Sequence, residues 1–184
     1  MLRKSKILSS ITAIAGLAAA AINHEAFAQT GATLPGGASS LQETYDDWMV
    51  ACVVNDQTRN QKLCALSQQQ LDKNSRQRVL AVEWRPKGDG IEGTAFLPFG
   101  LVFAKGAAFQ FDDGPFGKPA DFSTCLPAGC LVPIDFNKDI LAAMRRASRF
   151  NVKAIGQDGK DVTFTISLKG FSTAFDRTKQ LVGG

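Results

Sequence analysis

The sequence contains a single histidine, His24, which lies in the N-terminal segment. If that segment is removed on export, as its pattern predicts below, the working protein contains no histidine. Ser-His-Asp and Cys-His nucleophile systems and the commonest zinc ligand sets all need an imidazole group. The scarcity of histidine therefore argues against these catalytic classes and against a zinc centre.

Motifs for other cofactors and for nucleic acid are also missing. No cysteine pair has the C-x-x-C spacing of redox sites, and no D-x-D-x-D-G loop for calcium occurs. The 21 lysines and arginines and the 17 acidic residues give a net charge of only +4. We therefore expect no cofactor, no metal and no nucleic-acid partner.

The N-terminus has the pattern of an export signal. Three cations precede an apolar, Ala-rich run at 7–22, and Ala26 and Ala28 supply small residues at the −3 and −1 positions of a cleavage site. The apolar run is shorter than the roughly 20 residues that a membrane-spanning helix needs. We therefore predict a signal peptide at 1–28, no transmembrane segment after its cleavage, and a protein located in the periplasm or secreted.

The four cysteines form two close pairs along the chain, Cys52 with Cys64 and Cys125 with Cys130. Cysteines of exported proteins usually form disulfides, and four cysteines allow three pairings. Each local pair brackets a predicted turn, which favours Cys52–Cys64 and Cys125–Cys130, although the crossed pairings stay open. The C-x4-C spacing of the second pair favours a structural role over a redox role.

Residues 29–44 are rich in Gly, Ser, Thr, Ala and Pro and are expected to form a flexible leader. Residues 45–184 then suffice for a single domain with its own core. Their dominant pattern is an alternation of apolar and polar residues punctuated by turns, which predicts β-strands. The expected hairpins join 48–54 with 62–68, 79–85 with 91–97, and 150–155 with 161–169, and the strand pattern also continues over 101–104 and 107–112.

Two segments have helical periodicity instead. Apolar residues over 140–147 recur at helical spacing. The C-terminal end of this predicted helix, of about 10 residues, carries three cations, Arg145, Arg146 and Arg149. A second helix is expected after Gly170, with Ser172 as its N-cap. The predicted fold class is therefore mainly β: an antiparallel β-sandwich or a strongly curved sheet with two short helices and disulfide staples.

Two groups of charged residues are candidates for a functional site. A pair of carboxylates can serve glycoside hydrolysis, and the candidates are Asp112, Asp113, Asp121 and Asp135. Because Asp112 and Asp113 directly precede Gly114 and Pro115, roles in turns are the simpler interpretation. The three arginines, together with Lys153, can contact anionic lipid or glycan, although a solvated helix face is the simpler interpretation here too.

Several short motifs, taken in order, resemble a known family. They are Asp47 to Cys52 (DWMVAC), the second cysteine at Cys64, Leu97 to Leu101 (LPFGL), Cys125 to Cys130 (CLPAGC), and Ser167 to Phe171 (SLKGF) with Ala174. In this order behind a signal peptide, and over about 45–181, they are similar to the invasion-associated locus B family. The resemblance implies an exported protein of a Gram-negative, largely alphaproteobacterial cell, and the family's founding role is host-cell invasion, associated with entry into red cells. It implies no catalytic residues.

The residues and the resemblance together predict an exported, non-enzymatic protein that binds a protein or surface ligand in the envelope or on a host cell. The alternatives are an envelope hydrolase with a carboxylate-based site, and an anionic lipid or glycan binder that uses Arg145, Arg146 and Arg149. An enzyme should bring two or more of the aspartates together in a cleft. A binding module should disperse them and present a flat or grooved apolar surface.

Overall fold

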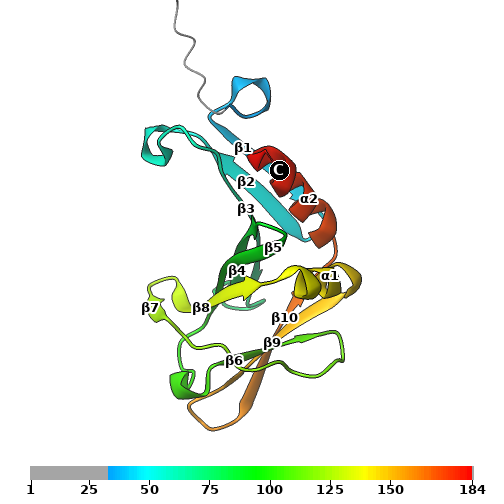
Figure 1. The fold of residues 1–184 in the computed structure, drawn as a ribbon. Coiled ribbons are helices and arrows are strands. Elements are labelled where there is room, and N and C mark those ends of the chain that lie inside the picture. Colours follow the sequence, from blue (N-terminus) through cyan, green and yellow to red (C-terminus); the bar gives the residue numbers. More distant parts are fainter. Residues whose placement is uncertain (1–32, 184) are drawn as a thin grey trace, which may run out of the picture. The chain divides into compact units, whose positions relative to one another are not determined.

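The computed structural model describes residues 33–183. These residues belong to one compact unit, which is drawn in Figure 1. The predicted signal peptide and the first residues of the predicted leader lie outside the described residues, so the cleavage site stays a prediction.

A seven-stranded antiparallel sheet makes up most of the fold, in the order β1-β2-β3-β4-β5-β8-β7. Its first five strands are hydrogen-bonded in chain order, so each neighbouring pair is a hairpin. The strands are β1 (Ser40–Tyr45), β2 (Trp48–Val53), β3 (Leu63–Leu71), β4 (Arg78–Lys87), β5 (Gly90–Leu97), β7 (Thr124–Leu126) and β8 (Gly129–Phe136).

A three-stranded antiparallel sheet, in the order β10-β9-β6, lies beside the larger one (Figure 1). Its strands are β6 (Ala107–Phe111), β9 (Arg149–Ile155) and β10 (Asp161–Ser167). Helix α1 (Lys138–Arg146) packs against β5 and β8, and helix α2 (Phe171–Val182) lies across β1 to β4. Both helices thus cover the larger sheet, and α2 covers its N-terminal half.

Strand alternation decides which side chains enter the core. In β2, Trp48, Val50 and Cys52 are buried, whereas the residues between them turn to the opposite face. Trp48 lies 5.1 Å from Trp84, measured between ring centroids, and both tryptophans contact Phe171 of α2. Trp84 also meets Phe150 of β9 at 5.5 Å, so one aromatic cluster joins the two sheets and α2.

Helix α2 begins directly after Gly170, which is its N-cap. Gly170 has a φ of 83°, and a Cβ at this position would lie 2.1 Å from the backbone oxygen of Tyr45. Only glycine therefore fits both the conformation and the space. The expectation that Ser172 caps the helix is wrong, because Ser172 lies inside the first turn.

Helix α1 begins after Asn137, whose side-chain oxygen accepts hydrogen bonds from backbone N–H groups of the first turn. The helix ends at Arg146, earlier than expected. The Asp112 carboxylate accepts hydrogen bonds of 2.9 Å from the backbone N–H groups of Ser148 and Arg149. Because these bonds hold the chain in the extended path into β9, Arg149 does not share a helix with the other two arginines, which corrects the sequence interpretation.

The first strand begins inside the segment 29–44, which was expected to be a flexible leader. β1 pairs with β2 along its whole length, from Ser40 to Tyr45. Leu34, further upstream, is buried in the core. The expectation of flexibility is therefore wrong for this part of the segment, because a short, mostly polar edge strand carries little apolar pattern.

Two more expectations are corrected around β6 and β8. The strand expected around Leu101 is absent: Leu101 makes a single β-bridge with Gly156, and Phe103–Lys105 form a 3-10 turn. Conversely, β8 is a strand that the sequence pattern did not predict. Pro133 argues against a central strand, but it is tolerated because β7 pairs only with the first three residues of β8.

The three expected hairpins are confirmed, namely β2 with β3, β4 with β5, and β9 with β10. The mainly β fold class is confirmed as well. It consists of two antiparallel sheets, two helices and two disulfides.

Candidate interaction surface

Two disulfides fasten two hairpins. Cys52 is bonded to Cys64 across β2 and β3, and Cys125 is bonded to Cys130 across β7 and β8. This is the local pairing, and it leaves none of the four cysteines as a free thiol. Cys52 and Cys64 are both buried in the core, so their bond joins packed strands.

Three of the four candidate aspartates make local structural contacts. Asp112 caps the start of β9, and the adjoining Asp113 forms an ion pair with Arg149 at 3.0 Å. Asp135 lies on β8 of the larger sheet and pairs with a lysine of β4 at 2.6 Å, while Asp121 precedes β7. Over residues 33–183 they assemble no shared carboxylate site, and no cluster of three or more His, Cys, Asp or Glu suited to a metal ion occurs there.

The three candidate arginines do not form one basic patch. Arg145 bonds both carboxylate oxygens of Asp176 and lies 5.0 Å over the ring of Phe175, which ties α1 to α2. The hydrogen bond from Arg145 lowers the pKa of the Asp176 carboxyl. Arg149 is held by its own aspartate, as described above, so Arg146 alone of the three has no ion-pair partner among the described residues.

Gln68 and Gln70 of β3 are polar residues whose role the sequence interpretation missed. The Gln68 side chain bonds both backbone groups of Ser167 in β10: its Nε2 donates to the oxygen at 2.9 Å, and its Oε1 accepts from the nitrogen at 3.1 Å. Gln70 Nε2 donates to the backbone oxygen of Thr165. The glutamines occupy positions that another strand would use beside β10, so this edge is not open to a partner. Alternation along β3 places the side chains of residues 68 and 70 on the inner face of the sheet, and this sequence pattern could have indicated a structural role for both glutamines.

The outer face of β2 to β5, opposite α2, carries several small, partly exposed side chains among larger and charged ones. The small ones include Ala51, Ala65, Ser67 and Thr94. Three adjoining hollows, of about 390, 520 and 550 Å³, lie along this face and share Glu83 of β4 in their lining. The face is therefore grooved, and Glu83 lies where the hollows meet.

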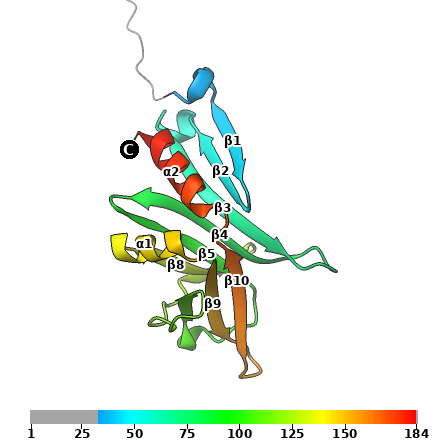
Figure 2. The ribbon, with the colours of Figure 1, turned by 90° about the vertical axis from the view of Figure 1, so that its right-hand side faces the viewer.

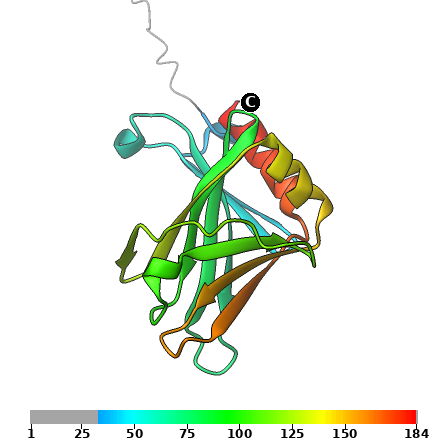
Figure 3. The same cartoon turned by 60° about the horizontal axis from the view of Figure 1, so that its bottom comes forward.

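The largest hollow lies where two hairpins diverge. The β3–β4 ladder ends at Leu66 and Trp84, whereas pairing of β3 with β2 continues to Leu63 and pairing of β4 with β5 continues to Lys87. Figure 2 and Figure 3 show the two hairpins separating beyond this point. We call the space the hairpin cleft, and its lining includes Val53, Leu63, Ala65, Arg85, Pro86 and Val182.

The hairpin cleft gathers large apolar side chains that the fold leaves exposed. Leu63 is 52% exposed, and Val53 and Val182 are each about 40% exposed. Three such residues from β2, β3 and α2 around one hollow are a local concentration, and concentrations of this kind mark interaction sites more often than scattered ones do. The cleft is thus the best candidate for an interaction surface in the described part of the chain.

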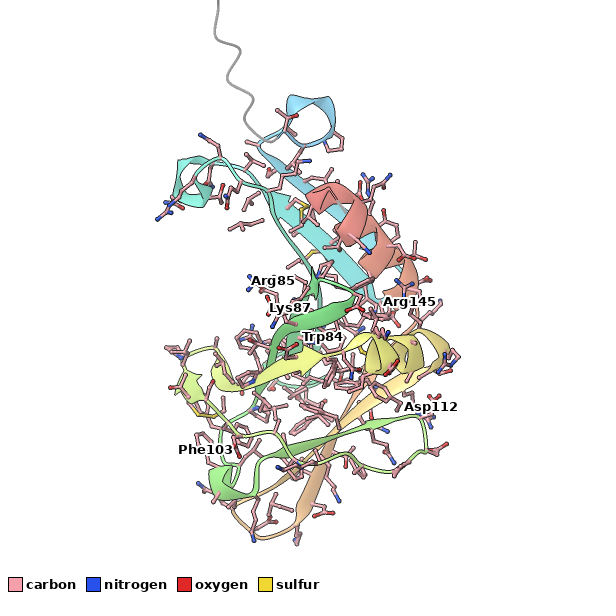
Figure 4. All side chains as sticks on the ribbon, in the orientation of Figure 1. Trp84, Arg85, Lys87, Phe103, Asp112 and Arg145 are labelled. Carbon is pink, nitrogen blue, oxygen red and sulfur yellow. A yellow bond between two sulfur atoms is a disulfide. The ribbon has the colours of Figure 1, made fainter. Side chains whose placement is uncertain are left out.

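Charged groups of β4 and β5 border the cleft. Glu92 accepts ion pairs from Lys87 at 3.1 Å and from Arg85 at 2.9 Å, and these bonds, that of Lys87 first, lower the pKa of its carboxyl. Figure 4 shows Arg85 and Lys87 on this side of the molecule, well away from Arg145. Glu83, which faces the same surface, has no ion-pair partner within residues 33–183.

Taken together, these features define a disulfide-stapled, mainly β protein with a grooved outer face. No helix within 33–183 is long and apolar enough to cross a membrane. Comparison with known proteins identifies the family to which this chain is similar. The model of the family "Invasion associated locus B (IalB) protein" matches residues 48–179.

Similar curated proteins and a solved structure point to the same family. An Invasion protein B homolog of Brucella abortus is 43% identical over 152 residues, which cover 82% of this chain and 86% of that protein. Invasion protein B of Bartonella bacilliformis is 35% identical over 155 residues, covering 82% and 81%. The crystal structure of invasion associated protein B from Bartonella henselae superposes with a TM-score of 0.70 at 28% identity, over 77% of this chain and 96% of that one. The chain therefore belongs to the invasion associated locus B family, which is not a known enzyme family, and the resemblance seen in the sequence is confirmed.

Proposed function

We propose that this protein is an exported, non-enzymatic binding protein that acts in the periplasm or outside the cell. Its partner is a protein or surface ligand of the envelope or of a host cell, and its role is host-cell association. The observation that carries the proposal is the match with relatives named invasion protein B along more than four-fifths of this chain.

Export is supported by the chemistry of the cysteines. Both disulfides join residues of a well-packed fold, and disulfides of this kind persist in oxidising compartments such as the periplasm or the outside of the cell. The N-terminal pattern of cations, apolar run and small residues agrees with this location.

Binding is supported over catalysis by how the charged residues are used. Asp112 and Asp113 hold the start of β9, Asp135 pairs with a lysine on the larger sheet, and two of the three candidate arginines are held by ion pairs. The hairpin cleft, by contrast, gathers exposed apolar side chains that no described element covers.

The experiment immobilises the purified, disulfide-bonded protein and exposes it to solubilised envelope and to host-cell membranes. We expect saturable retention of a partner that free protein competes away. Absence of saturable retention from both sources, or turnover of envelope glycan by the protein, would contradict the proposed function. Intact mass of protein recovered from the envelope tests export separately, because cleavage after Ala28 leaves a chain that begins at Gln29.

A further inference from the structure

The hairpin cleft exposes a strand edge as well as apolar side chains. Leu63, Cys64 and Ala65 are paired with β2 on one side, but the ladder to β4 has already ended. Backbone N–H and C=O groups of an antiparallel strand point alternately to its two sides. Leu63 and Ala65 form the hydrogen-bonded pairs with β2, so the N–H and C=O groups of Cys64 are the ones that this stretch offers to the cleft, as the edge of a sheet does.

The opposite wall of the cleft is a poorer edge. It is formed by the end of β4, where Pro86 pairs with Ile91 of β5. Proline has no N–H and cannot complete a ladder of hydrogen bonds on its free side. A strand that enters the cleft is thus directed to β3 and packs its side chains against Pro86 and Val182.

Glu83 lies at the floor of the groove and has no ion-pair partner among the described residues, although Lys62 and Arg85 also line the cleft. Ser67 and Glu83 are register partners, and Ser67 lies on the same face of β3 as Leu63. Side chains on one face of a strand repeat every two residues. A peptide that places an apolar residue beside Leu63 therefore brings a later residue of the same face toward Glu83, and a cation there would complete an ion pair.

We propose that the hairpin cleft binds an extended peptide segment of a partner protein by strand addition to β3. The segment has apolar residues at alternate positions, followed by Lys or Arg on the same face. The apolar residues fill the hollow of about 550 Å³ beside Val53, Leu63 and Val182, and the cation pairs with Glu83. This inference rests on the proposed function, since it names the surface and the partner chemistry that a binding role requires.

Strand addition accounts for these observations better than two other occupants. A fatty-acyl chain would use the apolar hollow but would leave both the strand edge and Glu83 without a role. A second copy of this chain would need a free edge strand with a cation on its face, yet β1, whose outer edge is free, carries Glu43 and no Lys or Arg. Strand addition is a common mode of peptide recognition, in which the backbone gives affinity and alternate side chains give specificity.

The test uses a phage-displayed library of random 12-residue peptides selected against the purified, disulfide-bonded protein. We expect selected peptides to share alternating apolar residues with a nearby Lys or Arg. The affinity of one such peptide is then measured by fluorescence anisotropy for the protein and for two cleft variants, Leu63→Asp and Glu83→Lys. Both variants should bind at least tenfold more weakly, and raising the salt concentration should weaken binding to the unmodified protein.

Two matched variants serve as controls. Leu71→Asp changes another exposed leucine of β3, at the end remote from the cleft, and Asp121→Lys makes a charge reversal on the loop before β7. Each should change the affinity less than twofold. Amide hydrogen exchange provides a readout that does not depend on mutation, because bound peptide should slow exchange at Cys64, whose N–H faces the cleft.

The proposal is overturned if no peptide is selected, if the cleft variants bind as well as their controls, or if exchange at Cys64 is unchanged by bound peptide. It is also overturned if the unmodified protein binds palmitate and Leu63→Asp abolishes that binding. The same holds if the unmodified protein self-associates in sedimentation experiments and Leu63→Asp abolishes the self-association. If the immobilised protein retains an envelope or host partner and Leu63→Asp retains it equally, the cleft assignment fails while the binding function stands.

Discussion

Gln68 holds both backbone groups of Ser167 with the two ends of its side-chain amide. The same Ser167 oxygen also accepts a 3.0 Å hydrogen bond from the indole nitrogen of Trp48. One buried glutamine of the seven-stranded sheet thereby fixes the last residue of the three-stranded sheet, just before the turn into α2. The relative placement of the two sheets depends on this contact and on the aromatic cluster beside it.

Replacing Gln68 by methionine should destabilise the protein by about 2 kcal/mol, because the Ser167 N–H loses its acceptor in a largely buried place. Gln69→Met, one residue along and exposed on the other face, should cost much less. Urea unfolding of both variants makes the comparison. Equal stabilities of the two would show that the amide contact contributes little.

The two buried tryptophans should respond differently to replacement by phenylalanine. Trp48 donates a hydrogen bond to Ser167, whereas the Trp84 indole nitrogen is buried without a hydrogen-bond partner among the described residues. Both substitutions remove similar ring volume, so the difference isolates the hydrogen bond. We expect Trp48→Phe to cost about 1 kcal/mol more than Trp84→Phe. A larger loss for Trp84→Phe would contradict the assigned role of the Trp48 bond.

The disulfide between Cys52 and Cys64 should matter more than the one between Cys125 and Cys130. It joins buried residues and closes the longer loop, with a sequence separation of 12 against 5. Replacing Cys52 and Cys64 by alanine should cost about 3 kcal/mol, and replacing the other pair about 2 kcal/mol. Urea melts of the two double variants decide the order, and the reverse order would identify the second hairpin as the more important clasp.

Acid should weaken the contact between β1 and α2. The Arg177 guanidinium donates two 2.7 Å hydrogen bonds to Glu43, and these bonds, assisted by the hydroxyl of Tyr45, lower the pKa of the Glu43 carboxyl. A lowered folded-state pKa means that the stabilisation is present above the unfolded pKa of about 4.3 and is lost as the pH falls through the folded value.

At pH 7, Glu43→Gln should therefore cost about 1 kcal/mol, and the cost should disappear in more acid solution. Asp113→Asn is the matched control, since the Asp113 side chain is 93% exposed in its ion pair with Arg149 and should cost almost nothing at either pH. Denaturant unfolding between pH 7 and pH 3 tests this. A Glu43→Gln penalty that stays constant across that range would contradict the assignment.

The sequence predicted the features that local pattern controls and missed those that depend on distant contacts. The β2–β3 hairpin, with Cys52 opposite Cys64, follows from alternation and spacing alone. The end of α1 does not, because it is set by Asp112, which lies 36 residues away from Ser148 in the chain. Ser172 was a reasonable cap by its chemistry, but the close approach of Tyr45 requires Gly170 at that position.

The sequence predicted the type of the candidate surface but not its position in the fold. A grooved apolar surface was expected of a binding module, and dispersed aspartates were expected with it. The hairpin cleft itself arises because β3 and β4 part beyond Leu66 and Trp84, and strand divergence leaves no mark in a local pattern. Single exposed residues such as Leu63 and Val182 become informative only when the fold brings them together.

The most direct test of the central claim, that this protein works by binding a partner in the hairpin cleft, is site-specific crosslinking in the living cell. A photo-crosslinking amino acid is placed at Leu63 in the cleft or, as the control, at Leu71 on the same strand. Irradiation should give a covalent adduct with a second protein from position 63 and none from position 71. An adduct from position 71 alone, or from neither position, would contradict the account.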